Sequence, residues 1–482
     1  MRAVSRILVL TLTIGLIGGL GAQLVPATAA AAAPVGQNPG VTTVRPVGGA
    51  TVGVSRGGRP LVVPVFLTRG GETVLDLTTD APGVSWAARG RESAVVSVHV
   101  DGRYTTDLVV SSDRRIPRSL ALGPLTRGPH RITLRFAADR SPAGARRVNL
   151  RDVRVSFAAP GSTAQLARRH APVLLGRVLP ELGSVFQNAT TDTPLLAWHE
   201  IYASPVAGLR RINYSIIWSN EDGGTDSPAL MARWGRTTDI EWVYAVDVDA
   251  AGNRVGPAYY HGPGHQILEF TGSYEGSHPV LQTCTVNNTV CDRGAGPMRF
   301  FLAADQTRPS QRAREYLMDT NPWTYPLMAE ELEREGKIES PSDPATPAVG
   351  DQRNYLYLEV DKDTTAAPGA APGVSVSVRL HGDATVYRSD HGVPSWSIAR
   401  DDPAATTVEL PAGTTADDVA EITAIRVPAG LDNQAPVTVT DVNRAFFLDQ
   451  NRVPTRSFIA AHGLGVSLTV AAQAAPIWTS AA

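Results

Sequence analysis

The chain has 482 residues, with 44 Lys and Arg against 46 Asp and Glu, and 43% of its residues are hydrophobic. That length predicts two or three domains with sizeable cores. The net charge of −2 excludes a basic nucleic-acid-binding protein, because such proteins hold phosphates with massed Lys and Arg. It also excludes an acidic disordered chain. We therefore expect a folded protein with no nucleic-acid partner.

The first 29 residues predict a secretory signal peptide. Arg2 and Arg6 form a short basic region, and an apolar run follows over residues 7–21. Small residues at positions 27–29 then suit a cleavage site. The alternative is an uncleaved anchor, but four glycines make the run a poor membrane span. No later stretch reaches eighteen apolar residues, so we expect a secreted protein with no transmembrane segment after signal removal.

An Ala-rich linker over residues 30–40 precedes a β-rich segment, residues 41–158. Apolar and polar residues alternate over residues 94–100 and 131–136, and Gly and Pro interrupt the strands at short intervals. This pattern predicts an antiparallel β-sandwich. The turn at Asp101 and Gly102 and the later GPHRI sequence, residues 128–132, resemble the jelly-roll accessory modules of secreted carbohydrate-active proteins. The resemblance implies either glycan binding or a purely structural role for this domain.

Residues 165–480 predict a second β-rich domain that carries most of the histidines and tryptophans. Strand-like runs occupy residues 211–218, 241–248 and 355–360. Short helices are expected over residues 163–170, 310–319 and 325–336, and the last ends on a glycine. The fold class is therefore mainly β: two antiparallel β-sandwich-type domains, the second with a few short helices.

The two cysteines, Cys284 and Cys291, lie seven residues apart around the turn dipeptide Asn287-Asn288. In an oxidising compartment two such cysteines predict a disulfide bond. A zinc site is disfavoured, because the spacing is long and no second cysteine pair exists.

Asp239 and Glu241 are the strongest candidates for chemistry. Two residues apart on a strand, they direct both carboxyl groups to one face, between Trp234 and Trp242. Like charges held so close need a positive partner. Either a divalent cation such as Ca²⁺ or Mg²⁺ or an arginine such as Arg236 would serve. The alternative is a solvated acidic pair on a sheet surface.

The segment around this pair, GRTTDIEW over residues 235–242, resembles the GHRHDWE signature of secreted necrosis-inducing cytolysins. It also resembles the GDWEH signature of the vacuolar-sorting-like β-sandwich family. The order of flanking segments over residues 170–280 agrees, including the GSHP sequence that contains His278. The resemblance implies that Asp239 and Glu241 hold a divalent cation. In this chain Arg236 and Thr238 replace the two signature histidines, and Ile240 replaces the tryptophan.

Three downstream histidines are candidates to complete the site: His261 and His265 in a Gly- and Pro-containing loop, and His278. A neutral imidazole acts as a metal ligand or a general base, and the alternative is that these histidines only cap turns. Asp222 and Asp226 lie in a Gly-rich acidic loop that would face a substrate or serve as a flexible connection. The chain lacks the Gly-x-Ser-x-Gly and His-Glu-x-x-His motifs, which disfavours a serine esterase or a zinc protease.

Two functions fit these features, and the sequence leaves open whether the protein is an enzyme. One is a secreted hydrolase, a glycoside hydrolase in particular, that acts on extracellular polysaccharide through an acidic, cation-assisted site. The other is a non-catalytic, cytolysin-like protein that binds cell-surface glycans or lipid head groups. The candidate catalytic residues are Asp239, Glu241 and His278, the first two also being candidate metal ligands, and the candidate substrate-binding residues are Trp218, Trp234, Trp242, Asp222, His261 and His265.

Overall fold

A computed structural model describes residues 51–221, 225–365, 371–428 and 434–480 of the chain. The expected signal peptide, residues 1–29, and linker, residues 30–40, lie outside the described residues. Within them strands far outnumber helices, and the sheets are antiparallel with one exception, so the predicted fold class is confirmed. None of the described helices is both long and apolar enough to span a bilayer.

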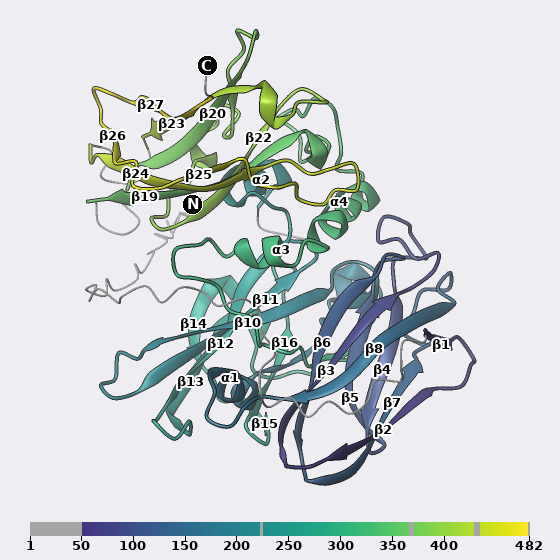
Figure 1. Ribbon diagram of the computed structural model, residues 1–482. Coiled ribbons are helices and arrows are strands. Elements are labelled where there is room, and N and C mark those ends of the chain that lie inside the picture. Colours follow the sequence, from purple (N-terminus) through teal and green to yellow (C-terminus); the bar gives the residue numbers. More distant parts are fainter. Residues whose placement is uncertain (1–50, 222–224, 366–370, 429–433, 481–482) are drawn as a thin grey trace, which may run out of the picture.

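The first pair of sheets is the predicted N-terminal sandwich (Figure 1). One sheet has the strand order β1-β8-β3-β6 and the other β2-β7-β4-β5. Apolar residues that alternate along these strands fill the space between the sheets, and the same core cluster includes the fully buried Trp86. The strands are β1 (Val52–Ser55), β2 (Leu61–Leu67), β3 (Gly71–Asp80), β4 (Ala94–Val100), β5 (Arg103–Val110), β6 (Ile116–Leu125), β7 (Gly128–Phe136) and β8 (Arg147–Phe157).

A second pair of sheets follows. Its larger sheet runs β10-β11-β12-β13-β14, and the smaller runs β15-β16-β9-β18 with β17 on β16. The exceptional pairing is here, because β16 and β9 are parallel. The strands are β9 (Val173–Leu175), β10 (Pro194–Ala203), β11 (Arg210–Trp218), β12 (Asp239–Val248), β13 (Arg254–Gly262), β14 (Gln266–Glu269), β15 (Tyr274–Glu275), β16 (His278–Thr283), β17 (Val290–Cys291) and β18 (Arg299–Phe300).

The third pair of sheets has a hydrophobic core of its own. The strand orders are β22-β19-β24-β25, with β26 on β24, and β21-β20-β23-β27. The expected domain over residues 165–480 thus contains two pairs of sheets. The strands are β19 (Tyr355–Thr364), β20 (Gly373–Leu380), β21 (Tyr387–Arg388), β22 (Ala404–Glu409), β23 (Val419–Val427), β24 (Val437–Phe446), β25 (Ile459–Ala461), β26 (Val466–Leu468) and β27 (Ala474–Thr479).

The helices agree with the sequence in part. Helices α1 (Thr163–His170) and α4 (Thr324–Glu335) are confirmed, and α4 ends where Gly336 adopts φ 71°. Helix α3 (Tyr316–Thr320) is shorter than predicted. The reason is tertiary: the backbone N–H of Ala313 donates to the Glu359 carboxylate instead of continuing a helix. Sequence analysis missed α2 (Ser227–Trp234), although a proline in its first turn is a common helix start.

Six short 3-10 helices complete the described secondary structure. They are η1 (Pro180–Leu182), η2 (Gln187–Ala189), η3 (Pro263–His265), η4 (Gln352–Asn354), η5 (Pro394–Trp396) and η6 (Ala416–Asp418).

Backbone and charged contacts join the three pairs of sheets. Between the first and second pairs, the N–H of Ala121 donates to the carbonyl of Phe301 at 2.8 Å. Between the second and third, the fully buried carboxylate of Glu359 on β19 accepts from Arg312 at 2.8 Å. The same carboxylate accepts from Arg444 on β24 at 3.3 Å. Glu359 therefore holds the guanidinium groups of Arg312 and Arg444 beside the hydrophobic core of the third pair of sheets.

We expect the substitution Glu359→Gln to lower the free energy of unfolding by roughly 3 kcal/mol, because Arg312 and Arg444 then share the carboxylate of Asp319 alone. Urea unfolding followed by tryptophan fluorescence measures the change. The matched control is Glu421→Gln, whose carboxylate meets the exposed Arg379 at 3.1 Å and should change stability by less than about 1 kcal/mol. Equal effects of the two substitutions would contradict this role for Glu359.

Candidate functional site

A polar cavity of about 260 Å³ lies where the end of α2 and the start of β12 meet two loops of the second pair of sheets. Acidic, basic and aromatic side chains share its wall. The lining residues are Glu221, Thr225, Arg233, Trp234, Arg236, Asp239, Glu241, His265, Asn287 and Arg314.

The predicted acidic pair reaches this cavity because of the local backbone. Gly235, with φ 64°, ends α2 in the left-handed conformation, and a three-residue connection leads into β12 at Asp239. Along β12, Asp239 pairs with Trp218 of β11 and Glu241 with Ile216. The side chain between the two acids, Ile240, is fully buried in the core. Period-two alternation therefore places both carboxyl groups at the cavity, as the sequence predicts.

Asp239 is buried, with 2% of its surface exposed. Its Oδ2 atom makes no hydrogen bond to any of the described residues. Burial raises the pKa of Asp239 well above its usual range, and the charges of Glu241 and Glu221 add to the effect. Burial likewise raises the pKa of Glu221 to about 7. Burial therefore favours the protonated form of Asp239, and Glu221 is partly protonated near pH 7.

Glu241 has the opposite state. Burial opposes its ionisation, yet the hydrogen bond from His261 and the charge of Arg314 together hold its pKa below the usual range. His261 Nδ1 lies 2.8 Å from Glu241 Oε2, and the imidazole stacks on Trp242 with ring centroids 4.9 Å apart. One cavity thus favours the protonated form of one carboxyl group and the ionised form of another, the two states that acid–base catalysis requires.

Glu241, His261 and His265 could also hold a metal ion, because one ligand atom from each lies within 4.8 Å of the others. His265 Nδ1 is 4.0 Å from Glu241 Oε1, and its Nε2 lies 2.9 Å from the side-chain nitrogen of Asn287. An ion at Nδ1 requires the Asn287 amide to turn its oxygen toward an Nε2–H. With that turn the donor set fits, and two imidazoles favour Zn²⁺ over the Ca²⁺ or Mg²⁺ expected from carboxylates alone.

Arginines on the other side of the cavity balance part of the acidic charge. Arg236, predicted as a counter-charge, donates to Glu315 at 2.9 Å and to the carbonyl of Thr238. Arg314 donates to the carbonyl of Ile240 at 2.8 Å and had no sequence signal, because it lies far along the chain. The cation of Arg400 lies 3.8 Å from the centre of the Trp234 ring. This packing fixes Trp234 at the cavity wall.

The predicted disulfide bond is confirmed, with 5.9 Å between the Cα atoms of Cys284 and Cys291. The loop that it closes supplies part of the cavity wall. Asn287 contacts His265, and Asn288 donates to Asp192 at 2.7 Å. The bond therefore holds two asparagines against the acidic centre.

Other predicted site residues lie elsewhere. His278 lines a different pocket, where its Nδ1 donates to the carbonyl of Ala171 at 2.9 Å. Trp218 is fully buried in the core, so no substrate reaches its ring in this structure. Asp226 is exposed just before α2, and Asp222 lies outside the described residues. Hence the cavity collects Asp239, Glu241, His265 and Trp234, with His261 and Trp242 behind Glu241.

No family model matches the chain, and no curated protein matches it. Similar solved structures include a CBM36 domain of a multidomain xylanase from the hindgut metagenome of Trinervitermes trinervoides, with 13% identity and a TM-score of 0.19, covering 25% of this chain and 98% of that one. Another is the carbohydrate-binding module CBM36 in complex with calcium and xylotriose, with 10% identity and a TM-score of 0.18, covering 24% and 98%.

A family 35 carbohydrate-binding module from Clostridium thermocellum has 10% identity and a TM-score of 0.17, covering 23% of this chain and 92% of that module. None of the structures named here is a necrosis-inducing protein. At such low scores the similarities assign no activity to this chain.

Removing the disulfide bond should loosen the cavity wall. For the double substitution Cys284→Ser and Cys291→Ser we expect the free energy of unfolding to fall by about 2.5 kcal/mol, because the unfolded chain regains the entropy of the closed loop. Urea unfolding measures the loss. Wild-type protein in excess reductant should unfold at the same urea concentration as the variant; a variant as stable as the oxidised wild type would refute this account.

The raised pKa of Glu221 predicts a pH-dependent stability. Between its usual pKa near 4.5 and about 7, the folded chain binds more protons at this carboxyl than the unfolded chain, so the stabilisation is lost as the pH rises through about 7. Glu221→Gln should therefore gain melting temperature relative to the wild type between about pH 5 and 8. Thermal melts followed by circular dichroism test this. The melting temperature of the control Glu269→Gln, at an exposed position of β14, should change with pH as that of the wild type does. The same pH dependence for Glu221→Gln as for the wild type would contradict the prediction.

Proposed function

We propose that the protein is a secreted hydrolase that cleaves polysaccharide outside the cell, with the acidic cavity as its catalytic centre. One observation carries the proposal: a single cavity gathers the carboxyl groups of Glu221, Asp239 and Glu241, and the buried Oδ2 of Asp239 has no hydrogen-bond partner among the described residues. A buried polar atom at a cavity wall costs stability, which is typical of groups kept for a ligand or a reaction.

The two carboxyl groups of β12 suit the two roles of glycoside hydrolysis. Protonated Asp239 would give its proton to the leaving oxygen as the glycosidic bond breaks. Ionised Glu241 would take a proton from the attacking water, whose oxygen forms the new bond to the sugar carbon. His261 and Arg314 maintain the charge on Glu241 that this role needs. Trp234 offers an aromatic surface beside the acids.

A second candidate function is cation-dependent recognition of a glycan without cleavage. The observation that favours it is the Glu241, His261 and His265 cluster, which fits Zn²⁺. In that case Glu241 serves as a metal ligand, and the bound ion supplies positive charge for sugar hydroxyl groups. The two functions differ in their response to a chelator.

The test is a screen of the protein lacking residues 1–29 against cell-wall and plant polysaccharides, with release of reducing sugars as the readout. Asp239→Asn and Glu241→Gln should each lower the hydrolysis rate at least about 100-fold, because each removes one proton transfer. Glu269→Gln, an exposed acid on the same sheet, should keep full activity.

A chelator decides between the two candidates. Acid–base hydrolysis should continue in the chelator, whereas cation-dependent recognition should appear as glycan binding that the chelator abolishes. Full activity of both β12 variants on a substrate that the wild type cleaves would refute the catalytic role of the pair.

A further inference from the structure

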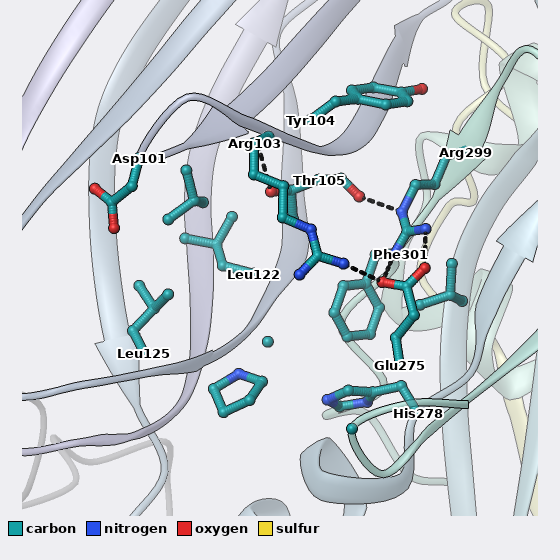
Figure 2. Close-up of a pocket in the computed structure, with 15 residues that line it drawn as sticks. Asp101, Arg103, Tyr104, Thr105, Leu122, Leu125, Glu275, His278, Arg299 and Phe301 are labelled. Atoms are coloured by element: carbon teal, nitrogen blue, oxygen red, sulfur yellow. Dashed lines mark hydrogen bonds and ion pairs between the residues drawn. The ribbon is translucent and has the colours of Figure 1, made fainter.

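A second pocket, of about 480 Å³, lies at the seam between the first and second pairs of sheets. Its wall comes from the turn between β4 and β5, the end of β6, the hairpin of β15 and β16, and β18 (Figure 2). The volume falls within the range of small-molecule sites, roughly 300–1,000 Å³. None of its lining residues belongs to the acidic cavity.

One side of this seam pocket is apolar. Leu122 and Phe301 are buried, and Leu125 is half-buried beside Pro124. These side chains come from β6 and from the end of β18, so both pairs of sheets contribute to the same surface. An apolar wall of this kind favours a ligand that has one face made of C–H groups.

The facing side is polar and well ordered. Arg299 donates to both carboxylate oxygens of Glu275, the second bond being 2.7 Å long, and its Nε donates to the carbonyl of Thr105 at 2.7 Å. The hydrogen bonds from Arg299 hold the pKa of Glu275 below its usual range, so the carboxylate is ionised. Bidentate pairing fixes both groups in one plane.

Arg103, the first residue of β5, also lines the pocket. Its guanidinium donates to Glu275 at 2.8 Å, and 76% of the side chain is exposed. Figure 2 shows it reaching down from the β4–β5 turn toward Glu275, opposite Leu125. A guanidinium has five N–H donors, and only one bond from Arg103 to the described residues is formed here, so donors remain for a ligand.

His278 supplies a buried ring nitrogen. Its Nδ1 donates to the carbonyl of Ala171, which fixes the ring and leaves the other nitrogen on its far edge. That atom, Nε2, is buried and makes no hydrogen bond to the described residues, with Glu72 Oε2 3.4 Å away. The side chain is only 3% exposed and lines the pocket. The carboxylate of Glu275 supplies the acceptor oxygens of this pocket, and Arg103 supplies donors.

The charges identify the class of ligand. The two guanidinium groups of Arg103 and Arg299 are balanced by the carboxylates of Glu275 and Asp101, so the pocket has no excess charge to attract an ion. It offers donors and acceptors in fixed positions opposite an apolar wall. A pyranose ring matches this pattern, because hydroxyl groups form its edge and C–H bonds its faces.

We infer that the seam pocket binds a neutral sugar unit of a glycan chain, as a non-catalytic site separate from the acidic cavity. The inference shares its ligand class with the proposed function but uses none of its residues. It gives the first pair of sheets a role in glycan recognition, and that role needs the second pair, because Glu275, Arg299 and Phe301 come from there.

Isothermal titration of the Glu241→Gln protein tests the inference without hydrolysis. The neutral probes are cellohexaose, xylohexaose and mannohexaose, and tetragalacturonic acid is the anionic probe. We expect at least one neutral hexaose to bind and the acid to bind more weakly. Adding Arg103→Ala, an exposed substitution that should leave the unfolding midpoint unchanged, should weaken binding at least about tenfold, or about 1.4 kcal/mol.

Arg379→Ala is the matched control, because Arg379 forms another exposed Arg–Glu pair, on the third pair of sheets, and it should bind like the parent. Glu275→Gln gives a second measurement and should also weaken binding. The inference is overturned if none of the neutral hexaoses binds at millimolar concentration, if tetragalacturonic acid binds best, or if Arg103→Ala and Glu275→Gln bind like the parent. If the wild-type protein hydrolyses none of the polysaccharides while Arg103-dependent binding is intact, the result counts against the catalytic proposal alone.

Discussion

The acidic site depends on the burial of two carboxyl groups at the start of β12. Desolvation of a charged group costs several kcal/mol, so two such groups side by side cannot both remain charged without partners. The surroundings treat the two groups differently: burial favours the protonated form of Asp239, whereas His261 and Arg314 favour the charged form of Glu241. Arg236 and Asn288 lower the pKa of Asp239 and so oppose part of the effect of burial.

Much of the architecture follows from the sequence, because strand periodicity and turn residues are local properties. The alternation along β4 and β7, the β12 acids and the Cys284–Cys291 bond all appear in the structure as predicted. Helix α2 escaped notice because the predicted acidic loop runs directly into it, with no polar and apolar alternation to mark a boundary. What local patterns show best is the strand content of a segment and the face on which a side chain lies.

The sequence predicts only in part which residues form each site, because packing between distant segments brings those residues together. Nothing near Arg314 in the sequence indicates that it meets Ile240, and nothing near His278 indicates that Ala171 fixes its ring away from Asp239. The family resemblance led to His278, yet the fold turns this residue toward the seam with the first pair of sheets. Where two sheets meet, closeness to a motif in the sequence is therefore a poor guide to which residues share a site.

The loop closed by Cys284 and Cys291 makes part of the cavity wall depend on a covalent bond. Asn287 contacts His265, and Asn288 donates to Asp192, from within the ring that the disulfide bond closes. A chain with two free thiols lacks that covalent ring, so this part of the cavity wall then depends on hydrogen bonds alone. The shape of the cavity is therefore coupled to the redox state of a bond that is not itself among the lining groups.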